Sequence, residues 1–218
     1  DIGLFLRNMY KTYNLKINYL TIISDPVNIP MYFSSGGSNQ ILSACDNSVY
    51  GNSNDDSFQE ISVGRIMGLS TSDISSYIAR DLFYDQMSHP KNIILISPWN
   101  DGTDGKEAQV GIQRIFQNIG YDTKTYFRDE NVEMSDISEI EKYSFISYSD
   151  HGITEGWLSA NIMSYTIRGR NIWLSSPVVL SLACSTCGYD FSSLKNDLFC
   201  VNLLRRGALV VEGAAVGI

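Results

Sequence analysis

Two apolar runs in the second half of the chain each end in a reactive side chain. Residues 145–152 read Phe-Ile-Ser-Tyr-Ser-Asp-His-Gly, and residues 177–184 read Pro-Val-Val-Leu-Ser-Leu-Ala-Cys. His151 and Cys184 are 33 positions apart (184 − 151), which is enough chain for one crossover between neighbouring parallel strands. Because parallel strands end at the same edge of a sheet, we expect the imidazole and the thiol to lie close together.

Apolar runs of strand length alternate with amphipathic segments along most of the chain. We expect strands at 17–23, 61–66, 93–97, 121–127, 144–149, 178–183 and 208–211. We expect helices at 2–13, after Ser70, at 108–119, from Ser135 to 143 and from Ser193 to 204. The long stretch 26–56 is rich in Pro, Gly, Ser and Asn and is predicted to be irregular.

Helical spacing also predicts which side chains face the core. In the helix after Ser70 these are Ile74, Tyr77, Ile78 and Leu82. In the helix at 108–119 they are Ala108, Ile112, Ile115, Phe116 and Ile119, with Gly120 as the C-cap.

Continuous apolar strands separated by amphipathic helices are typical of a parallel sheet covered on both faces. The predicted fold is therefore α/β, a three-layer sandwich with a mostly parallel sheet. The length of 218 residues and the 44% hydrophobic content favour one domain with a substantial core. Because the chain stops just after a strand-like run, we interpret residues 1–218 as a fragment that lacks its C-terminal part.

Composition argues against several classes of function. A net charge of −8 and the absence of a basic cluster disfavour a nucleic-acid partner. No run approaches the roughly 20 apolar residues of a membrane helix, so we predict no membrane span in this segment. The low count of 16 Lys and Arg residues, beside abundant Ser, Asn and Tyr, favours an extracellular or cell-surface protein.

The paired histidine and cysteine favour acyl-transfer chemistry. Cys184 would attack a carbonyl carbon while His151 carries the proton to the leaving amine. The backbone N–H groups of Gly152 and Cys184 would bind the resulting oxyanion. A carboxylate that orients His151 could be Asp46 or Asp150, and we prefer Asp46 because successive strand side chains point to opposite faces.

Other interpretations of the same residues stay open. A cysteine that ends an apolar strand is commonly a small core residue. The Cys184-x-x-Cys187 spacing also fits a disulfide, which would silence the nucleophile, whereas no second ligand pair supports a zinc site. The chemistry needs no cofactor, although an oxygen-rich turn such as Asp55-Asp56 could hold a structural calcium ion. A non-peptidase acyl hydrolase or transferase is a further alternative.

Four blocks of the chain resemble the gingipain family of cysteine peptidases, within the group that includes caspases and legumains. They are residues 20–30 with Asp25-Pro26, residues 50–65 ending in Val-Gly-Arg, residues 147–152 followed by Glu155 and Trp157, and Leu182-Ala183-Cys184.

The resemblance implies a caspase-like fold, endopeptidase activity on peptide or protein substrates, His151 as general acid/base and Cys184 as nucleophile. It places the oxyanion hole at Gly152 and Cys184, and a histidine-orienting carboxylate near Asp46. It also implies substrate-binding roles for Trp157 and for Asp56, the latter as the acidic floor of a pocket for a basic residue. The alternative is a catalytically inactive peptidase-fold module, joined to flanking domains in a surface assembly.

Overall fold

The structure is a computed structural model that describes residues 2–13, 17–24, 28–29, 32–35, 43–46, 50, 60–98, 105–127, 136–188 and 198–214. The chain forms two compact units, Asp1–Gly68 and Leu69–Ile218. The expectation of a single domain over residues 1–218 stays a prediction.

The first unit combines one helix with two strand pairs. Helix α1 covers Ile2–Tyr13, and β1 (Tyr19–Ile23) pairs in parallel with β4 (Ser62–Ile66). The helix and both strands were expected from periodicity. Arg65 in β4 also donates a hydrogen bond from Nη1 to the carbonyl oxygen of Ser24, at 3.0 Å.

The expectation of an irregular stretch at 26–56 is wrong in part. Strands β2 (Tyr32–Ser35) and β3 (Ser43–Asp46) form an antiparallel pair within it, with Tyr32 opposite Asp46. Strands of four residues are too short to give a clear alternation of polar and apolar side chains, so periodicity could not reveal them.

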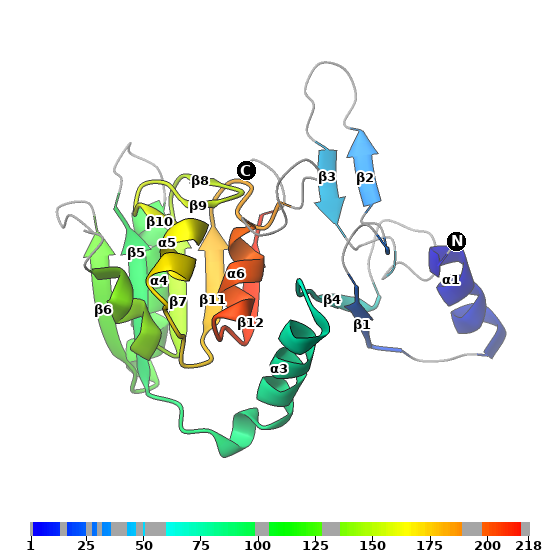
Figure 1. The fold of residues 1–218 in the computed structure, drawn as a ribbon, viewed down its shortest axis with the longest axis horizontal. Helices are drawn as coiled ribbons and strands as arrows, with labels where there is room; N and C mark the ends of the chain where they lie inside the picture. The colour runs from blue at the N-terminus through cyan, green and yellow to red at the C-terminus, as the bar shows by residue number, and fades with distance from the viewer. Residues whose placement is uncertain are drawn as a thin grey trace. The chain divides into compact units, whose positions relative to one another are not determined.

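The larger sheet of the second unit contains five described strands in the order β12-β11-β7-β5-β6 (Figure 1). Its strands are β5 (Asn92–Ser97), β6 (Asp122–Phe127), β7 (Phe145–Ser149), β11 (Val178–Leu182) and β12 (Val210–Gly213). All four strand pairs are parallel. The order and direction confirm the predicted α/β class.

Helices cover both faces of this sheet. Helix α4 (Gly105–Asn118) connects β5 to β6, and α6 (Phe199–Arg205) lies between β11 and β12. These two crossovers run in opposite directions along the strand order. Since crossovers between parallel strands are right-handed, α4 and α6 cover opposite faces, which gives three layers.

The inward faces of two helices differ from expectation. In α4, Ala108 and Ile115 are exposed, as is Ile119 just after the helix, whereas Gln109 is buried and donates from Nε2 to Oγ of Ser147 at 2.9 Å. The spacing of apolar residues did not predict this inward polar side chain. In α3 (Thr71–Leu82), Leu82 is 70% exposed, and Ile74, Tyr77 and Ile78 are only half-buried.

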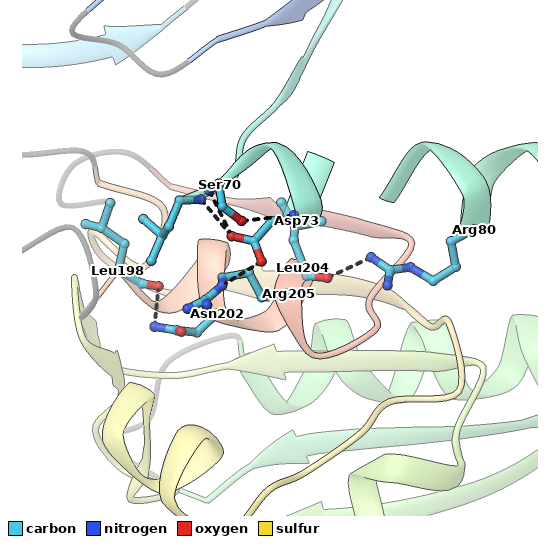
Figure 2. Close-up of polar contacts among 8 residues, drawn as sticks. Ser70, Asp73, Arg80, Leu198, Asn202, Leu204 and Arg205 are labelled. Atoms are coloured by element: carbon cyan, nitrogen blue, oxygen red, sulfur yellow. Dashed lines mark hydrogen bonds and ion pairs between the residues drawn. The ribbon is translucent and has the colours of Figure 1, made fainter. Parts of the chain in front are cut away.

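Polar contacts join α3 to α6 (Figure 2). Ser70 and Asp73 form a capping box at the start of α3, and Asp73 Oδ1 lies 3.2 Å from Nε of Arg205. Arg80 donates from Nη2 to the carbonyl oxygen of Leu204 at 2.7 Å. That carbonyl belongs to the last turn of α6, where a cation offsets the negative end of the helix dipole.

Other boundaries shift by a few residues. The segment expected to be a short helix before Tyr143 is a 3₁₀ helix, η2 (Asp136–Lys142), and α6 begins at Phe199. The caps expected at Ser135 and Ser193 lie outside the described residues. The crossover between β7 and β11 contains a small antiparallel sheet and a helix that periodicity did not predict: β8 (Gly152–Ile153), β9 (Gly156–Trp157), β10 (Ile162–Met163) and α5 (Ser164–Gly169).

Candidate active site

Strands β7 and β11 are direct neighbours, and their register aligns the two reactive residues. Ser149 is paired with Leu182, and His151 and Cys184 each follow that pair by two positions. His151 is exposed and Cys184 is half-buried. Both residues therefore leave the sheet from adjacent parallel strands at the same level, as the apolar runs had led us to expect.

Gly152 brings the two loops into direct contact. A β-carbon at this position would lie 2.6 Å from Cγ2 of Thr186, 2.8 Å from Cβ of Ala183 and 3.0 Å from the carbonyl oxygen of Cys184. All three distances are at or below the closest approach of ordinary side chains, so only glycine fits here without a shift. The histidine loop thus packs against the backbone of the cysteine loop.

Hydrogen bonds fix the backbone on both sides of His151. Its carbonyl oxygen accepts from the hydroxyl group of Tyr148 at 2.7 Å and from the N–H of Leu158 at 3.0 Å. Its own N–H donates to Oδ1 of Asp150 at 2.6 Å, and Oγ of Ser159 donates to the same oxygen at 2.7 Å. This carboxylate oxygen therefore organises the turn that presents the histidine.

Tyr148 is fully buried beneath this turn. Its ring stacks on that of Trp157, with centroids 4.6 Å apart and planes 12° from parallel. Burial raises the pKa of Tyr148 well above its usual value. The hydroxyl group therefore stays protonated and keeps its role as a donor to His151.

The cysteine loop is a tight turn. Ser185, directly after Cys184, has a φ of +56°, which is uncommon for a residue other than glycine. The turn closes with a hydrogen bond of 2.8 Å from the N–H of Gly188 to the carbonyl oxygen of Ser185. Strained backbone of this kind is concentrated at functional sites, where the surrounding structure holds it in place.

A disulfide joins Cys187 to Cys200, and Cys184 is present as a thiol. The Cys184–Cys187 bridge that the sequence left open is thus not the one formed. The bond ties the cysteine loop to the first turn of α6. Phe199, in the same turn, donates from its N–H to the carbonyl oxygen of Thr154 in the histidine segment at 3.0 Å. One end of α6 therefore anchors both loops.

Trp157 lies below the site, wholly buried in the core. Its Nε1 donates to Oγ of Ser181 at 2.8 Å, and that oxygen lies 2.8 Å from Oγ1 of Thr186. Sequence reasoning missed Tyr148, Ser181 and Thr186 as parts of the site. A signal was present for Ser181, because a hydroxyl group within a buried apolar strand needs a polar partner.

The remaining predicted site residues fall elsewhere. Asp46 is the last residue of β3 in the first unit, and Asp56 and the Asp55-Asp56 turn lie outside the described residues. Among the described residues, no group of three or more His, Cys, Asp or Glu side chains is arranged to hold a metal ion.

The sequence matches the model of peptidase family C25 over residues 1–215. The chain belongs to peptidase family C25. This confirms the resemblance to gingipains that the sequence motifs indicated. No curated protein matches the chain.

Solved structures agree with this family in fold. The Arg-specific cysteine proteinase gingipain R aligns with a TM-score of 0.81 and 18% identity, over 99% of this chain and 52% of that one. A complex of the Porphyromonas gingivalis RgpB pro- and mature domains gives a TM-score of 0.81 and 17% identity, over 99% and 54%. A structure described as a protease gives 0.80 and 18%, over 99% and 50%.

The C25 chain thus spans about half the length of these solved structures. At this level of identity the likeness concerns the fold, and it confirms the caspase-like α/β sandwich. Within the part of the chain that the structure describes, helices long and apolar enough to cross a membrane are absent.

Proposed function

We propose that this chain carries the reactive residues of a cysteine endopeptidase. The thiolate of Cys184 attacks the carbonyl carbon of the scissile peptide bond, and His151 donates a proton to the leaving amine. Water then attacks the thioester while His151 accepts a proton, which releases the carboxylic acid and restores the thiolate and the protonated histidine. Membership of a peptidase family supports this reaction class.

The observation that carries the proposal is the matched placement of the two residues. Each lies two positions beyond the Ser149–Leu182 pair on adjacent parallel strands, and Gly152 packs against the carbonyl group of Cys184. The presence of Cys184 as a thiol also supports a nucleophilic role and weakens the argument for an inactive module.

A substitution tests the proposal directly. In the protein that carries this chain, Cys184→Ala is expected to abolish peptide hydrolysis while the melting temperature stays unchanged. Ser75→Ala, at an exposed position of α3, is the control and should retain activity. Hydrolysis that survives in Cys184→Ala would refute the assignment of the nucleophile.

Labelling separates the enzyme from the inactive module and from an acyl hydrolase. A peptidyl chloromethyl ketone should modify Cys184 stoichiometrically, as read by peptide mapping. No labelling under reducing conditions would favour the inactive, structural or binding module. Thiol-dependent ester cleavage without peptide cleavage would favour the acyl hydrolase or transferase.

We also propose roles for two carboxylates that the resemblance implied. Asp46 would orient the imidazole of His151. Asp56 would bind the basic side chain of the substrate residue before the scissile bond. The description of gingipain R as Arg-specific supports the second assignment by analogy. Asp56→Asn should then lower the preference for arginyl and lysyl over leucyl peptides, and Asp46→Asn should lower kcat.

Trp157 belongs to the proposal as a supporting residue. Its complete burial and its hydrogen bond to Ser181 favour a role beneath the loops rather than contact with the substrate.

We further propose that the protein acts outside the cell or at its surface. The Cys187–Cys200 disulfide supports this location, because disulfides persist in oxidising compartments. Cell fractionation would test it. The mechanism requires no cofactor, and activity that survives EDTA would argue against an essential calcium ion.

A further inference from the structure

Two peptide bonds beside the reactive residues have their carbonyl oxygens held by buried hydroxyl groups. On the histidine loop, the hydroxyl of Tyr148 donates to the carbonyl oxygen of His151 at 2.7 Å. On the cysteine loop, Oγ1 of Thr186 donates to the carbonyl oxygen of Ala183 at 3.3 Å. A hydrogen bond from a side-chain hydroxyl group to a backbone carbonyl oxygen thus occurs just beyond the ends of both neighbouring strands.

Each carbonyl shares a rigid plane with an N–H group of the site. The carbonyl of His151 lies in one peptide plane with the N–H of Gly152, and that of Ala183 lies in one plane with the N–H of Cys184. The described residues contain no cis peptide bond, so in both planes the N–H points opposite to the carbonyl. A hydrogen bond that fixes the oxygen therefore also sets the direction of the N–H.

The register of the small sheet agrees for Gly152. Gly152 is opposite Trp157, and the adjacent ladder bond runs from the N–H of Leu158 to the carbonyl oxygen of His151. In an antiparallel ladder this pattern marks a pair that exchanges no hydrogen bonds, so the N–H of Gly152 points away from β9.

Thr186 receives its own orientation from a relay of donors. Trp157 Nε1 donates to Ser181 Oγ at 2.8 Å, and Ser181 Oγ lies 2.8 Å from Thr186 Oγ1. Either hydroxyl of the Ser181–Thr186 pair can be the donor, and donation from Ser181 leaves the single proton of Thr186 for the carbonyl oxygen of Ala183. Ser181 and Thr186 are each 1% exposed, so water does not compete for these bonds.

We propose that Tyr148 and Thr186 are positioning residues that aim the N–H groups of Gly152 and Cys184 at the oxyanion of the tetrahedral intermediate. This inference rests on the proposed function. Thr186 also links the two donors, because its methyl group packs against Gly152 while its hydroxyl group bonds to Ala183. The two N–H groups are thereby held as one unit.

The positioning role is tested by removing each hydroxyl group separately, in the protein that carries this chain. Tyr148→Phe and Thr186→Val should each lower kcat by about tenfold or more with little change in KM, because oxyanion binding stabilises the transition state more than the substrate. Affinity for a peptide aldehyde, whose adduct with the thiol presents an oxyanion, should fall in parallel. Alkylation of Cys184 by iodoacetamide, which forms no oxyanion, should keep its rate.

Two control variants sharpen the result. Thr186→Ser restores the hydroxyl group and should recover most of kcat. Tyr126 is another buried tyrosine, on β6, and its hydroxyl group donates to Glu139 Oε2 at 2.9 Å. Tyr126→Phe should leave kcat unchanged.

Unchanged kcat in both hydroxyl variants, beside an active parent protein, would overturn the positioning role and leave the proposed function intact. A parallel fall in alkylation rate and kcat would also overturn it, since general disruption of the loop would then explain the loss. A parent protein that cleaves no peptide and resists the chloromethyl ketone would overturn the proposed function and this inference together.

Discussion

Gly152 packs against Thr186 so closely that a β-carbon at position 152 would lie 2.6 Å from the threonine methyl group. The contact joins the loop that carries His151 to the loop that carries Cys184. Its neighbours are a backbone carbonyl and two short side chains, so it has little room to relax.

Gly152→Ala should therefore reduce both stability and activity. Overpacking of this kind costs about 1–3 kcal/mol, and the displaced loops would lose peptide hydrolysis. Gly111→Ala is the control, because a β-carbon there meets nothing within 4 Å and alanine favours the helix. Urea unfolding and kcat/KM measure the two effects, and equal stability of the two variants would contradict the expected packing.

The contact between Asp73 and Arg205 should make stability depend on pH. Burial alone would raise the pKa of Asp73, but hydrogen bonds from Arg205, Leu69 and Ser70 and the charge of Arg205 outweigh it and hold the pKa below 3.8. A lowered carboxyl pKa stabilises the fold above the unfolded-state value, and this stabilisation is lost as pH falls through the folded-state pKa.

Asp73→Asn should accordingly lower the free energy of unfolding by about 1 kcal/mol at pH 7, with a smaller difference near pH 3. Asp81→Asn, on the exposed surface of the same helix, should have almost no effect. Denaturant titrations at both pH values provide the measurement. A loss of the same size at pH 7 and pH 3 would argue against an ionic contribution.

The Cys187–Cys200 disulfide should stabilise the second unit. It closes a loop with a sequence separation of 13, and the double variant Cys187→Ala with Cys200→Ala should lose about 3 kcal/mol. Mass spectrometry of unreduced peptides checks the pairing. A Cys184–Cys187 bridge in the native protein would contradict both the pairing and the proposed nucleophile.

The buried hydrogen bond from Trp157 to Ser181 should contribute to the stability of the fold. Ser181→Ala leaves the indole N–H buried without its acceptor, which costs about 1–3 kcal/mol. Trp173→Phe is a suitable comparison, because that side chain is 58% exposed, and it should cost much less. Thermal unfolding of the two variants measures the difference, and equal melting temperatures would show that the bond contributes little.

The sequence predicts the large sheet well because its strands are continuous apolar runs. Ile93 to Ile96 are all at most 1% exposed, and such strands differ sharply from the amphipathic segments beside them. The placement of His151 and Cys184 at one sheet edge followed from the same runs.

Features that depend on tertiary partners could not be predicted in the same way. The inward orientation of Gln109 depends on Ser147, which is 38 positions away, and the hydroxyl group of Thr186 matters only because Ser181 and Ala183 surround it. The disulfide partner of Cys187 was not predicted either: the sequence analysis considered only Cys184, because spacing does not show that Cys200 lies beside Cys187. The periodicity of apolar residues indicates which side chains are buried locally. It does not indicate which residue, distant in the sequence, contacts a given side chain.

The pairing of Ser149 with Leu182 also bears on how chains with this arrangement can vary. The register fixes how far each reactive residue lies beyond the end of its own strand. It does not limit the number of residues that connect the two strands. Insertions between β8 and α5 could lengthen that connection and leave the reactive pair in place. A single residue inserted within β11 would instead turn the following side chains to the opposite face. Distant relatives are therefore better aligned by counting from the strand ends than by the number of residues between histidine and cysteine.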